Sequence, residues 1–326
     1  MRRQGHATIE GTRRFHDRHA PKVVENHVRD AQGLAVSSLG IGTYLGELDD
    51  ATDTRYIAAI KRAYELGINV VDTAVNYRAQ RSERAVGKAI AGLPRDEIVV
   101  CSKAGFLPFD TNRPADPGGY MRATYVDSGL IPEDELVQGC HSLNRRFLAD
   151  QLEKSRENLN LETIDVYYLH NPETQLAEVQ RDLFMKRVRL AFQFLEDAVT
   201  AGHIRYYGAA TWGGYREQRA MKTHLDLAEM VKLAEEVAGA EHHFKFIQVP
   251  LNRAMPEAAT RPTQHGCSSL EAAKKHGMFV MSSASIHQGK LDRGLEWTRS
   301  QPGNGVALVG MSRIDHLEAN VKSFAK

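Results

Sequence analysis

The sequence predicts a single-domain (β/α)8 TIM barrel, and three observations support that prediction. Short runs rich in Val, Ile and Tyr alternate with longer amphipathic stretches along the 326 residues. Strands that are buried on both faces, as in a parallel barrel, have this continuous apolar character. No Gly-x-Gly-x-x-Gly follows any of the runs, which argues against a doubly wound dinucleotide-binding sheet. The length suits one barrel of about 250 residues with insertions.

The eight expected strands and most of the expected helices follow from this alternation. The strands are, in chain order, Leu39–Gly42, Ile68–Asp72, Ile98–Lys103, Asp165–His170, Tyr206–Ala210, Phe246–Val249, Phe279–Ser282 and Ala307–Val309. The first helix is expected to begin at a Thr52 or Asp53 cap and to end at Gly67. The other helices are expected from a Ser82 cap, along Leu148–Leu159, and at Arg181–Ala201, Leu225–Val237, Ser268–His276 and, capped by Ser312, Ser312–Phe324. Residues 289–303 are the weakest helix candidate.

The chain before the first strand is expected to have two parts. Residues 1–21 are basic and polar, with no apolar stretch behind the charges, so they are predicted to form a flexible or loosely docked arm rather than a secretory signal. Residues 22–326 then form the barrel. Within them, Lys22–Ser37 are expected to form a hairpin around Asp30 to Gly33, which would cap the N-terminal end of the barrel.

One connection is much longer than the others. Roughly forty residues rich in Gly, Pro and Asp lie between Gly105 and Arg146, whereas loops beyond ~15 residues are usually functional or disordered. This insertion follows the third strand and therefore emerges on the face where barrel enzymes place their active sites. A substrate lid is one interpretation. A passive insertion or an oligomer contact is the other, and the sequence leaves both open.

Composition excludes several classes of partner. The formal net charge is +1 and no apolar run is long enough to span a bilayer, so neither a nucleic acid nor a membrane is expected as a partner. The three cysteines, Cys101, Cys140 and Cys267, are odd in number and form no Cys-x-x-Cys. This pattern predicts a reducing, cytoplasmic compartment and gives no reason to expect a metal site.

Four polar residues are expected to meet at the C-terminal end of the barrel. Asp72, Lys103 and His170 end the second, third and fourth strands, and Tyr77 lies five residues beyond Asp72. Adjacent parallel strands lie ~4.8 Å apart, so these side chains can converge on one pocket. Each residue alone has an ordinary structural explanation, as a helix cap or a solvated side chain. All four on consecutive strands are much less expected by chance.

The four residues suit proton transfer to a carbonyl oxygen. A tyrosine hydroxyl has a pKa of about 10, and a nearby ammonium lowers it. Lys103 is expected to be that ammonium, Asp72 to hold Lys103 charged and oriented, and His170 to orient the substrate oxygen by a hydrogen bond. Tyr77 would be the general acid or base. Since the set contains neither a nucleophile nor a metal, the hydride must come from a bound cofactor.

Motifs along the chain resemble those of the aldo-keto reductases. They are Asn69-Val-Val-Asp72-Thr-Ala-Val-Asn-Tyr77, Ser82-Glu-Arg-Ala-Val-Gly-Lys-Ala-Ile90, Val99-Val-Cys-Ser-Lys103, Ile164-Asp-Val-Tyr-Tyr-Leu-His170-Asn-Pro172, Gly202-His-Ile-Arg-Tyr-Tyr-Gly208 and Val309-Gly-Met-Ser-Arg-Ile-Asp-His-Leu-Glu-Ala-Asn320. The resemblance runs from about Leu39 onward, with the residues after Gly105 as an insertion. It implies that Tyr77 is the proton donor and that Asp72, Lys103 and His170 complete a catalytic tetrad.

The resemblance also implies a nicotinamide cofactor extended over the C-terminal face. The cofactor-binding positions that it indicates are Gly42, Thr43, Thr211, Gln248, Ser283, Lys290, Ser312, Arg313, His316 and Asn320. Several depart from the family pattern: Ala210 and Thr211 replace a Ser-Asn pair, and Ser283 replaces a stacking aromatic that Trp212 is a candidate to supply. Lys290, Ser312 and Arg313 are candidates for a 2′-phosphate, which favours NADP(H) over NAD(H).

The substrate is expected to be a small carbonyl or alcohol that contacts Tyr44 and Trp212. Three hypotheses remain open on the sequence. The leading one is reduction of an aldehyde or ketone by NADPH. The second is oxidation of a sugar hemiacetal with NAD, and the third is a nicotinamide-binding regulatory subunit without significant turnover. The sequence does not distinguish a monomer from a homo-oligomer.

Overall fold

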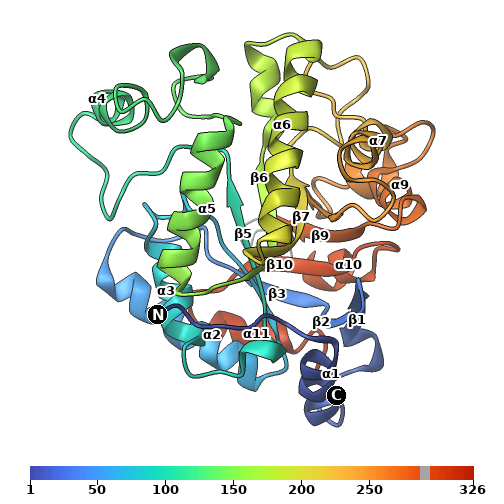
Figure 1. Cartoon of the computed structure of the whole chain (residues 1–326). Helices are drawn as coiled ribbons and strands as arrows, with labels where there is room; N and C mark the ends of the chain where they lie inside the picture. The colour runs from blue at the N-terminus through green and yellow to red at the C-terminus, as the bar shows by residue number, and fades with distance from the viewer. Residues whose placement is uncertain (287–293) are drawn as a thin grey trace.

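A closed barrel of eight parallel strands forms the centre of the computed structural model, which describes residues 1–286 and 294–326. The strands follow one another around the barrel in chain order, and β10 closes it against β3 (Figure 1). They are β3 (Leu39–Gly42), β4 (Val70–Asp72), β5 (Val99–Ala104), β6 (Ile164–His170), β7 (Ile204–Ala210), β8 (Phe244–Pro250), β9 (Phe279–Ser283) and β10 (Val306–Gly310). The predicted (β/α)8 fold class and all eight expected strands are confirmed.

Helices between the strands cover the outside of the barrel (Figure 1). They are α2 (Asp50–Glu65), α3 (Arg81–Ile90), α5 (Arg145–Leu159), α6 (Arg181–Thr200), α7 (Leu227–Ala238), α8 (Glu257–Thr260), α9 (Ser269–Lys275), α10 (Gly294–Ser300) and α11 (Ile314–Val321). Short 3-10 helices lie at Glu25–His27, Arg95–Glu97 and Pro172–Ala177. No helix among the described residues is long and apolar enough to cross a bilayer.

Three of the predicted helix caps are wrong by one to four residues. Asp49 caps α2, because its carboxylate accepts the backbone N–H of Thr52, so neither Thr52 nor Asp53 is the cap. Ser82 lies inside the first turn of α3, and its hydroxyl donates to the backbone oxygen of Thr43. Ser312 also lies outside α11, which begins after Arg313. Such shifts arise because the approaching loop, and not the side chain alone, selects the capping position.

The barrel interior is filled by side chains that point inward from the strands and by a hairpin beneath them. Strands β1 (Val28–Ala31) and β2 (Leu34–Ser37) pair antiparallel, as predicted. Leu34 and Val36 are fully buried in the same cluster as the inward-facing Val70 and Val166. The side chain of Asn69, just before β4, donates to the backbone of Ala35 and accepts from that of Ser37. The hairpin therefore closes the N-terminal end of the barrel, as the sequence predicted.

The first 21 residues differ from the expected flexible arm. They contain helix α1 (Ile9–His19), which buries Phe15 completely. Arg14 and Arg18 of α1 form ion pairs with the buried Glu97, and the backbone N–H of Ala7 donates to Asp165 at 2.7 Å. The helix docks through one buried face, which the many charged residues hide in the sequence. Phe15 and His19, four residues apart, both lie on that face.

The insertion after β5 forms its own small substructure on the flank of the barrel. It contains α4 (Pro117–Met121), a π-helix at Arg122–Val126 and a 3-10 helix at Glu133–Glu135. Its two ends pair with each other, because Phe106 and His141 form an antiparallel bridge. Its buried Tyr125 lies edge-on to Phe147 of α5, with the ring centroids 5.8 Å apart. Figure 1 shows this part, in green, extending outward beside α5.

Candidate active site

The four predicted catalytic residues lie together where β4, β5 and β6 end. The strand register places Gly42 beside Asp72, Asp72 beside Cys101, and Lys103 beside Tyr168. Lys103 Nζ donates to Asp72 Oδ2 at 2.6 Å and to the backbone oxygen of Thr73 at 2.7 Å. The neighbouring ends of β4 and β5 thus bring Asp72 and Lys103 together as a buried ion pair at the C-terminal end of the barrel.

Lys103 remains a cation despite its complete burial. Burial alone would lower the pKa of Lys103, but the negative charge of Asp72 and the neighbouring Tyr77 outweigh that effect, and the pKa is raised. Asp72 is itself nearly buried and is held from a second side, because Gln248 Nε2 donates to Asp72 Oδ1 at 2.9 Å. The ammonium is therefore fixed in position and charged.

Tyr77 lies directly over this ammonium. Lys103 Nζ is 4.8 Å from the centroid of the Tyr77 ring. The ring is half buried and is flanked edge-on by Tyr44 at 5.0 Å and by His170 at 5.7 Å, centroid to centroid. Burial raises the pKa of Tyr77, and Lys103 only opposes that rise. Lys103 thus acts in the expected direction, but burial outweighs it, and the raised pKa keeps Tyr77 protonated at neutral pH.

His170 is neutral and faces the same space. Burial lowers the pKa of its imidazole well below the ordinary value, and Lys103 and His141 lower it further. The ring lies edge-on to Phe106, with centroids 5.1 Å apart. Its Nδ1 atom is buried and has no hydrogen-bond partner among the described residues. A neutral ring whose Nδ1 makes no bond is best accommodated with the proton on Nε2, which leaves an N–H donor at that atom.

The structure adds residues that sequence analysis missed. Glu173 is buried, and its Oε1 atom accepts the backbone N–H groups of Trp212 at 2.7 Å, Gly213 at 3.1 Å and Gly214 at 3.3 Å. It therefore ties the loop after β7 to the loop after β6. Burial raises the pKa of Glu173, and the three N–H groups counteract the rise. Its place just after the His170 motif was the signal that could have identified it.

Most of the predicted cofactor-binding residues line the C-terminal end of the barrel. Thr43 and Gln248 both hydrogen-bond Asp72, so they also support the tetrad. Ser283 is half buried at the end of β9. Thr211 is buried, and its hydroxyl oxygen has no hydrogen-bond partner among the described residues. An unpaired buried hydroxyl of this kind fits a carboxamide ligand, because its bonding capacity is otherwise unused.

The residues predicted to bind a 2′-phosphate are placed less uniformly. Ser312 and Asn320 are half buried and His316 is exposed. Arg313 is exposed, and its guanidinium is paired with the carboxylate of Asp315. A phosphate at Arg313 would therefore compete with Asp315. Lys290 lies outside the described residues.

The two predicted substrate contacts are both exposed but are differently placed. Tyr44 is 64% exposed and touches Tyr77, as the ring distance above shows. Trp212 is 52% exposed on the loop after β7, where Glu173 holds its backbone. Tyr44 beside Tyr77 and Phe106 beside His170 make the surroundings of these two residues aromatic.

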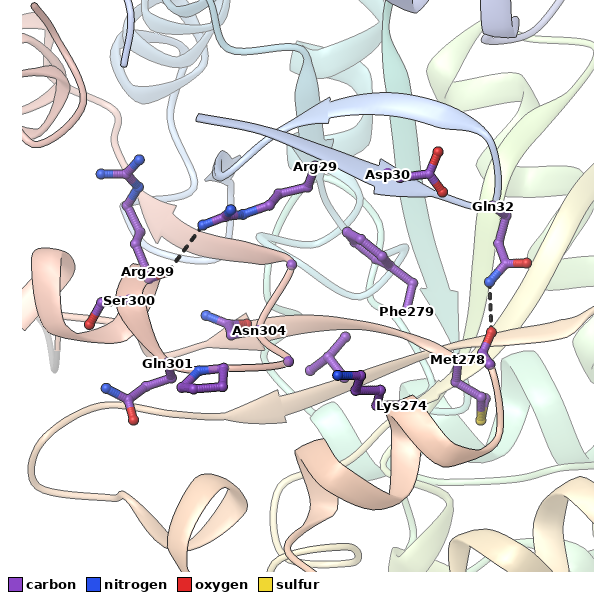
Figure 2. Close-up of a pocket in the computed structure, with 15 residues that line it drawn as sticks. Arg29, Asp30, Gln32, Lys274, Met278, Phe279, Arg299, Ser300, Gln301 and Asn304 are labelled. Atoms are coloured by element: carbon purple, nitrogen blue, oxygen red, sulfur yellow. Dashed lines mark hydrogen bonds between the residues drawn. The ribbon is translucent and has the colours of Figure 1, made fainter. Parts of the chain in front are cut away.

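A polar hollow at the opposite end of the barrel is separate from this site. It has a volume of about 570 Å³ and lies between the hairpin turn and the loops that enter β9 and β10. Figure 2 shows Arg29 reaching across it toward the backbone of Arg299, to which it donates at 3.5 Å. The guanidinium of Arg299 is itself bonded to Ser38. Among the described residues, no group of three or more His, Cys, Asp or Glu could hold a metal ion.

Comparisons with known proteins agree with the barrel and identify its family. The family model described as the Aldo/keto reductase family matches residues 38–294. An aldo/keto reductase from Klebsiella pneumoniae, solved in complex with NADP and acetate, has a TM-score of 0.60 and 21% identity, covering 92% of this chain and 90% of that one. At that identity the likeness shows the fold.

Two curated relatives are similar over part of their length. D-threo-aldose 1-dehydrogenase from a Pseudomonas species is 31% identical over 65% of this chain and 62% of its own length. A putative voltage-gated potassium channel subunit beta from Schizosaccharomyces pombe is 28% identical over 61% of this chain and 49% of its own. The matched region thus spans less than two thirds of either relative. Because the family model matches most of the chain, this protein belongs to the aldo/keto reductase family.

Proposed function

We propose that this protein catalyses reversible hydride transfer between a nicotinamide cofactor and a small carbonyl or alcohol substrate, with Tyr77 as the general acid or base. The observation that supports this proposal most directly is the buried Lys103–Asp72 pair beneath the Tyr77 ring. An ammonium held there stabilises negative charge on the phenol oxygen without giving up its own proton. This is the requirement for a tyrosine that releases and recovers a proton in each catalytic cycle.

His170 has a complementary task in this proposal. Its neutral ring, with a donor at Nε2, would hydrogen-bond the substrate oxygen and orient the carbonyl carbon. When bound, the nicotinamide would supply or accept the hydride, and Thr211, Gln248, Ser283 and Asn320 are the residues that would hold it. In reduction the Tyr77 hydroxyl would protonate the substrate oxygen; in oxidation the same oxygen would take the proton back.

We infer NADP(H) as the preferred cofactor. The structural relative from Klebsiella pneumoniae was solved with NADP, and Arg313 and Ser312 lie at the start of α11, where a 2′-phosphate would meet a guanidinium and a helix N-terminus. The three cysteines are free, which supports the reducing, cytoplasmic setting predicted from their number.

A second candidate is oxidation of a sugar. It is favoured by the relative named D-threo-aldose 1-dehydrogenase and by the aromatic surroundings of Tyr77, because flat rings suit the apolar faces of sugars as well as aryl groups. A regulatory role without turnover is the third, supported by the relative named as a potassium channel subunit beta. The buried ion pair beneath Tyr77 is better suited to turnover than to cofactor binding alone.

Steady-state turnover on a panel of aldehydes, ketones and aldoses, with NADPH, NADH, NADP and NAD in turn, tests the three candidates together. Reduction of carbonyls with NADPH is the expected result. Faster oxidation of aldoses than reduction of any carbonyl would favour the second candidate. Tight cofactor binding without turnover on any substrate would contradict both enzymatic candidates.

A further inference from the structure

We propose that His141, which the insertion delivers to the barrel, is a positioning residue for His170, and that it is the last link of a hydrogen-bond chain that begins at Arg187. This inference rests on the proposed function, since it gives His170 a supporting structure for its role at the substrate oxygen. It also assigns the insertion a task, namely to hold one member of the tetrad in place.

The chain consists of three hydrogen bonds, of which two join buried side chains and the third reaches a backbone oxygen. Arg187 Nη1 donates to Gln175 Oε1 at 2.6 Å. Gln175 Nε2 lies 2.8 Å from His141 Nδ1, and His141 Nε2 lies 2.8 Å from the backbone oxygen of His170. Gln175 and His141 are fully buried and Arg187 is 7% exposed. Arg187 also donates to the backbone oxygen of Asp134, which belongs to the insertion.

The positive charge of Arg187 determines which atom is the donor and which the acceptor in each of the three bonds. A guanidinium can only donate, so the amide oxygen of Gln175 must face Arg187. The amide nitrogen of Gln175 then faces His141 and donates to Nδ1, which leaves the imidazole proton on Nε2. His141 is neutral, because burial lowers its pKa to about 4. The ring therefore donates from Nε2 to the carbonyl of His170, and no other tautomer satisfies both neighbours.

The carbonyl of His170 needs this partner because the ladder between β5 and β6 ends one residue before it. The pairing of β5 with β6 stops at Ala104 and Leu169. The next residue, Gly105, turns away with a φ of +145°, and a Cβ there would lie 2.8 Å from both His141 Nε2 and the His170 oxygen. Glycine thus leaves room for the imidazole, which continues the ladder by one hydrogen bond where the backbone departs.

The bond acts on the catalytic ring through a single peptide group. The N–H on the other side of that peptide, at Asn171, donates to Ala210 at 2.6 Å. The peptide is therefore fixed from both sides, between the insertion and the end of β7. Because the His170 ring has no partner at Nδ1 among the described residues, its placement depends on this peptide and on contacts with Phe106 and Tyr77. A shift of about 1 Å in a catalytic group can cost roughly 10²-fold in rate.

Three variants test the positioning role by their effect on kcat. His141→Phe removes the donor and preserves the ring, and it should lower kcat roughly tenfold or more, with the KM for cofactor nearly unchanged. His141→Gln keeps an N–H at the position of Nε2 and should recover most of the loss. Tyr125→Phe is the matched control, because its buried hydroxyl also anchors the insertion, to the Pro108 oxygen at 2.6 Å, but does not touch His170. It should lower Tm by a similar amount and leave kcat unchanged.

A spectroscopic readout makes the test independent of turnover and of the stability of the variants. In wild-type protein with ¹⁵N-labelled histidine, the resonances lost in His141→Phe identify His141, and they should show a neutral ring protonated at Nε2 through neutral pH. The His170 resonances should shift in His141→Phe and stay in place in Tyr125→Phe. A His141 protonated at Nδ1, or a His141→Phe variant with wild-type kcat and unshifted His170, would overturn the proposal.

The failure of the proposed function has a different signature. It would appear as absent turnover in the wild type, or as turnover that Tyr77→Phe does not affect, while the His170 shift in His141→Phe persists. A double variant adds a check on the chain itself. Gln175→Leu should lower kcat as His141→Phe does, and the two together should be no worse than His141→Phe alone, because both break the same chain.

Discussion

Lys103 Nζ lies 2.6 Å from Asp72 Oδ2, and both side chains are buried at the ends of adjacent strands. A buried pair is costly to desolvate, and it adds little net stability compared with apolar residues of the same size. We therefore expect this pair, under the Tyr77 ring, to serve proton transfer rather than stability. The first two predictions follow from that geometry.

Tyr77→Phe should lower kcat for carbonyl reduction by about 10²–10⁴-fold, the usual contribution of a positioned general acid. The ring would still fill the space beside Tyr44 and His170, so cofactor affinity and Tm should change little. Single-turnover reduction, together with a fluorescence titration of NADPH, separates the two effects. A variant that keeps near-normal kcat would exclude Tyr77 as the proton donor.

Lys103→Met should impair both directions of the reaction, and the pH dependence should reveal the cause. In the wild type the pKa of Tyr77 is raised, so the protonated form that reduction needs persists through neutral pH and is lost as the pH rises through that pKa. Oxidation needs the deprotonated form and should accelerate with pH. Without the ammonium the pKa of Tyr77 rises further, so the rise in the oxidative rate should move to higher pH. An unchanged pH profile would show that Lys103 does not act on Tyr77.

Thr211→Val should weaken cofactor binding roughly five- to tenfold, which is the value of one hydrogen bond. It should leave the stability of the free protein unchanged or slightly higher, because the Thr211 hydroxyl has no partner in the described structure. Thr163→Val is the control. The hydroxyl of Thr163 donates to the Gly202 oxygen at 2.7 Å, far from the tetrad at the start of β6, so this variant should lose Tm and keep its cofactor Kd. The reverse pattern would remove Thr211 from the cofactor site.

Arg313 offers a direct test of cofactor preference. Arg313→Leu should raise the KM for NADPH by roughly tenfold and leave the KM for NADH nearly unchanged, because only the former carries a 2′-phosphate. Asp315→Asn should have the opposite effect on NADPH, since it frees the guanidinium that Asp315 now holds. Equal effects on both cofactors would show that Arg313 does not contact the 2′-phosphate.

Glu97 should make the docking of α1 sensitive to acid. Burial alone would raise the pKa of Glu97, but hydrogen bonds from Arg18, Tyr64 and Arg14 lower it to about 2, from an ordinary value of 4.5. The stabilisation is therefore complete above about pH 4.5 and is lost as the pH falls toward 2. Urea unfolding of Glu97→Gln should show lower stability at pH 7, by roughly 1–3 kcal/mol, and a shallower decline on acidification. Parallel acid profiles for the two proteins would contradict this account.

The barrel and the tetrad were predictable because both depend on local patterns. Val/Ile-rich runs define strands, and in a parallel barrel their last residues must share one end, so Asp72, Lys103 and His170 could be placed without coordinates. The charge state of Tyr77 could not be predicted, because it reflects a balance between burial and Lys103 that sequence does not quantify. His141 was also missed: its role depends on a bridge to Phe106 across more than thirty residues of insertion. Phe15 was hidden for a simpler reason, since a single aromatic among many charges makes a weak amphipathic pattern.

The bridge between Phe106 and His141 has a consequence for how far the sequence of the insertion can change. The insertion leaves the barrel and returns to it at neighbouring points, so a change in its length between Leu107 and Cys140 would not change the distance that β5 and α5 must span. The ends are fixed by Gly105 and His141, and the interior is held to the barrel by Tyr125, which packs on Phe147, and by the Asp134 backbone, which accepts from Arg187. The exposed residues of the insertion can therefore vary beside the candidate active site, while the buried residues that hold it to the barrel, His141 among them, are expected to stay fixed.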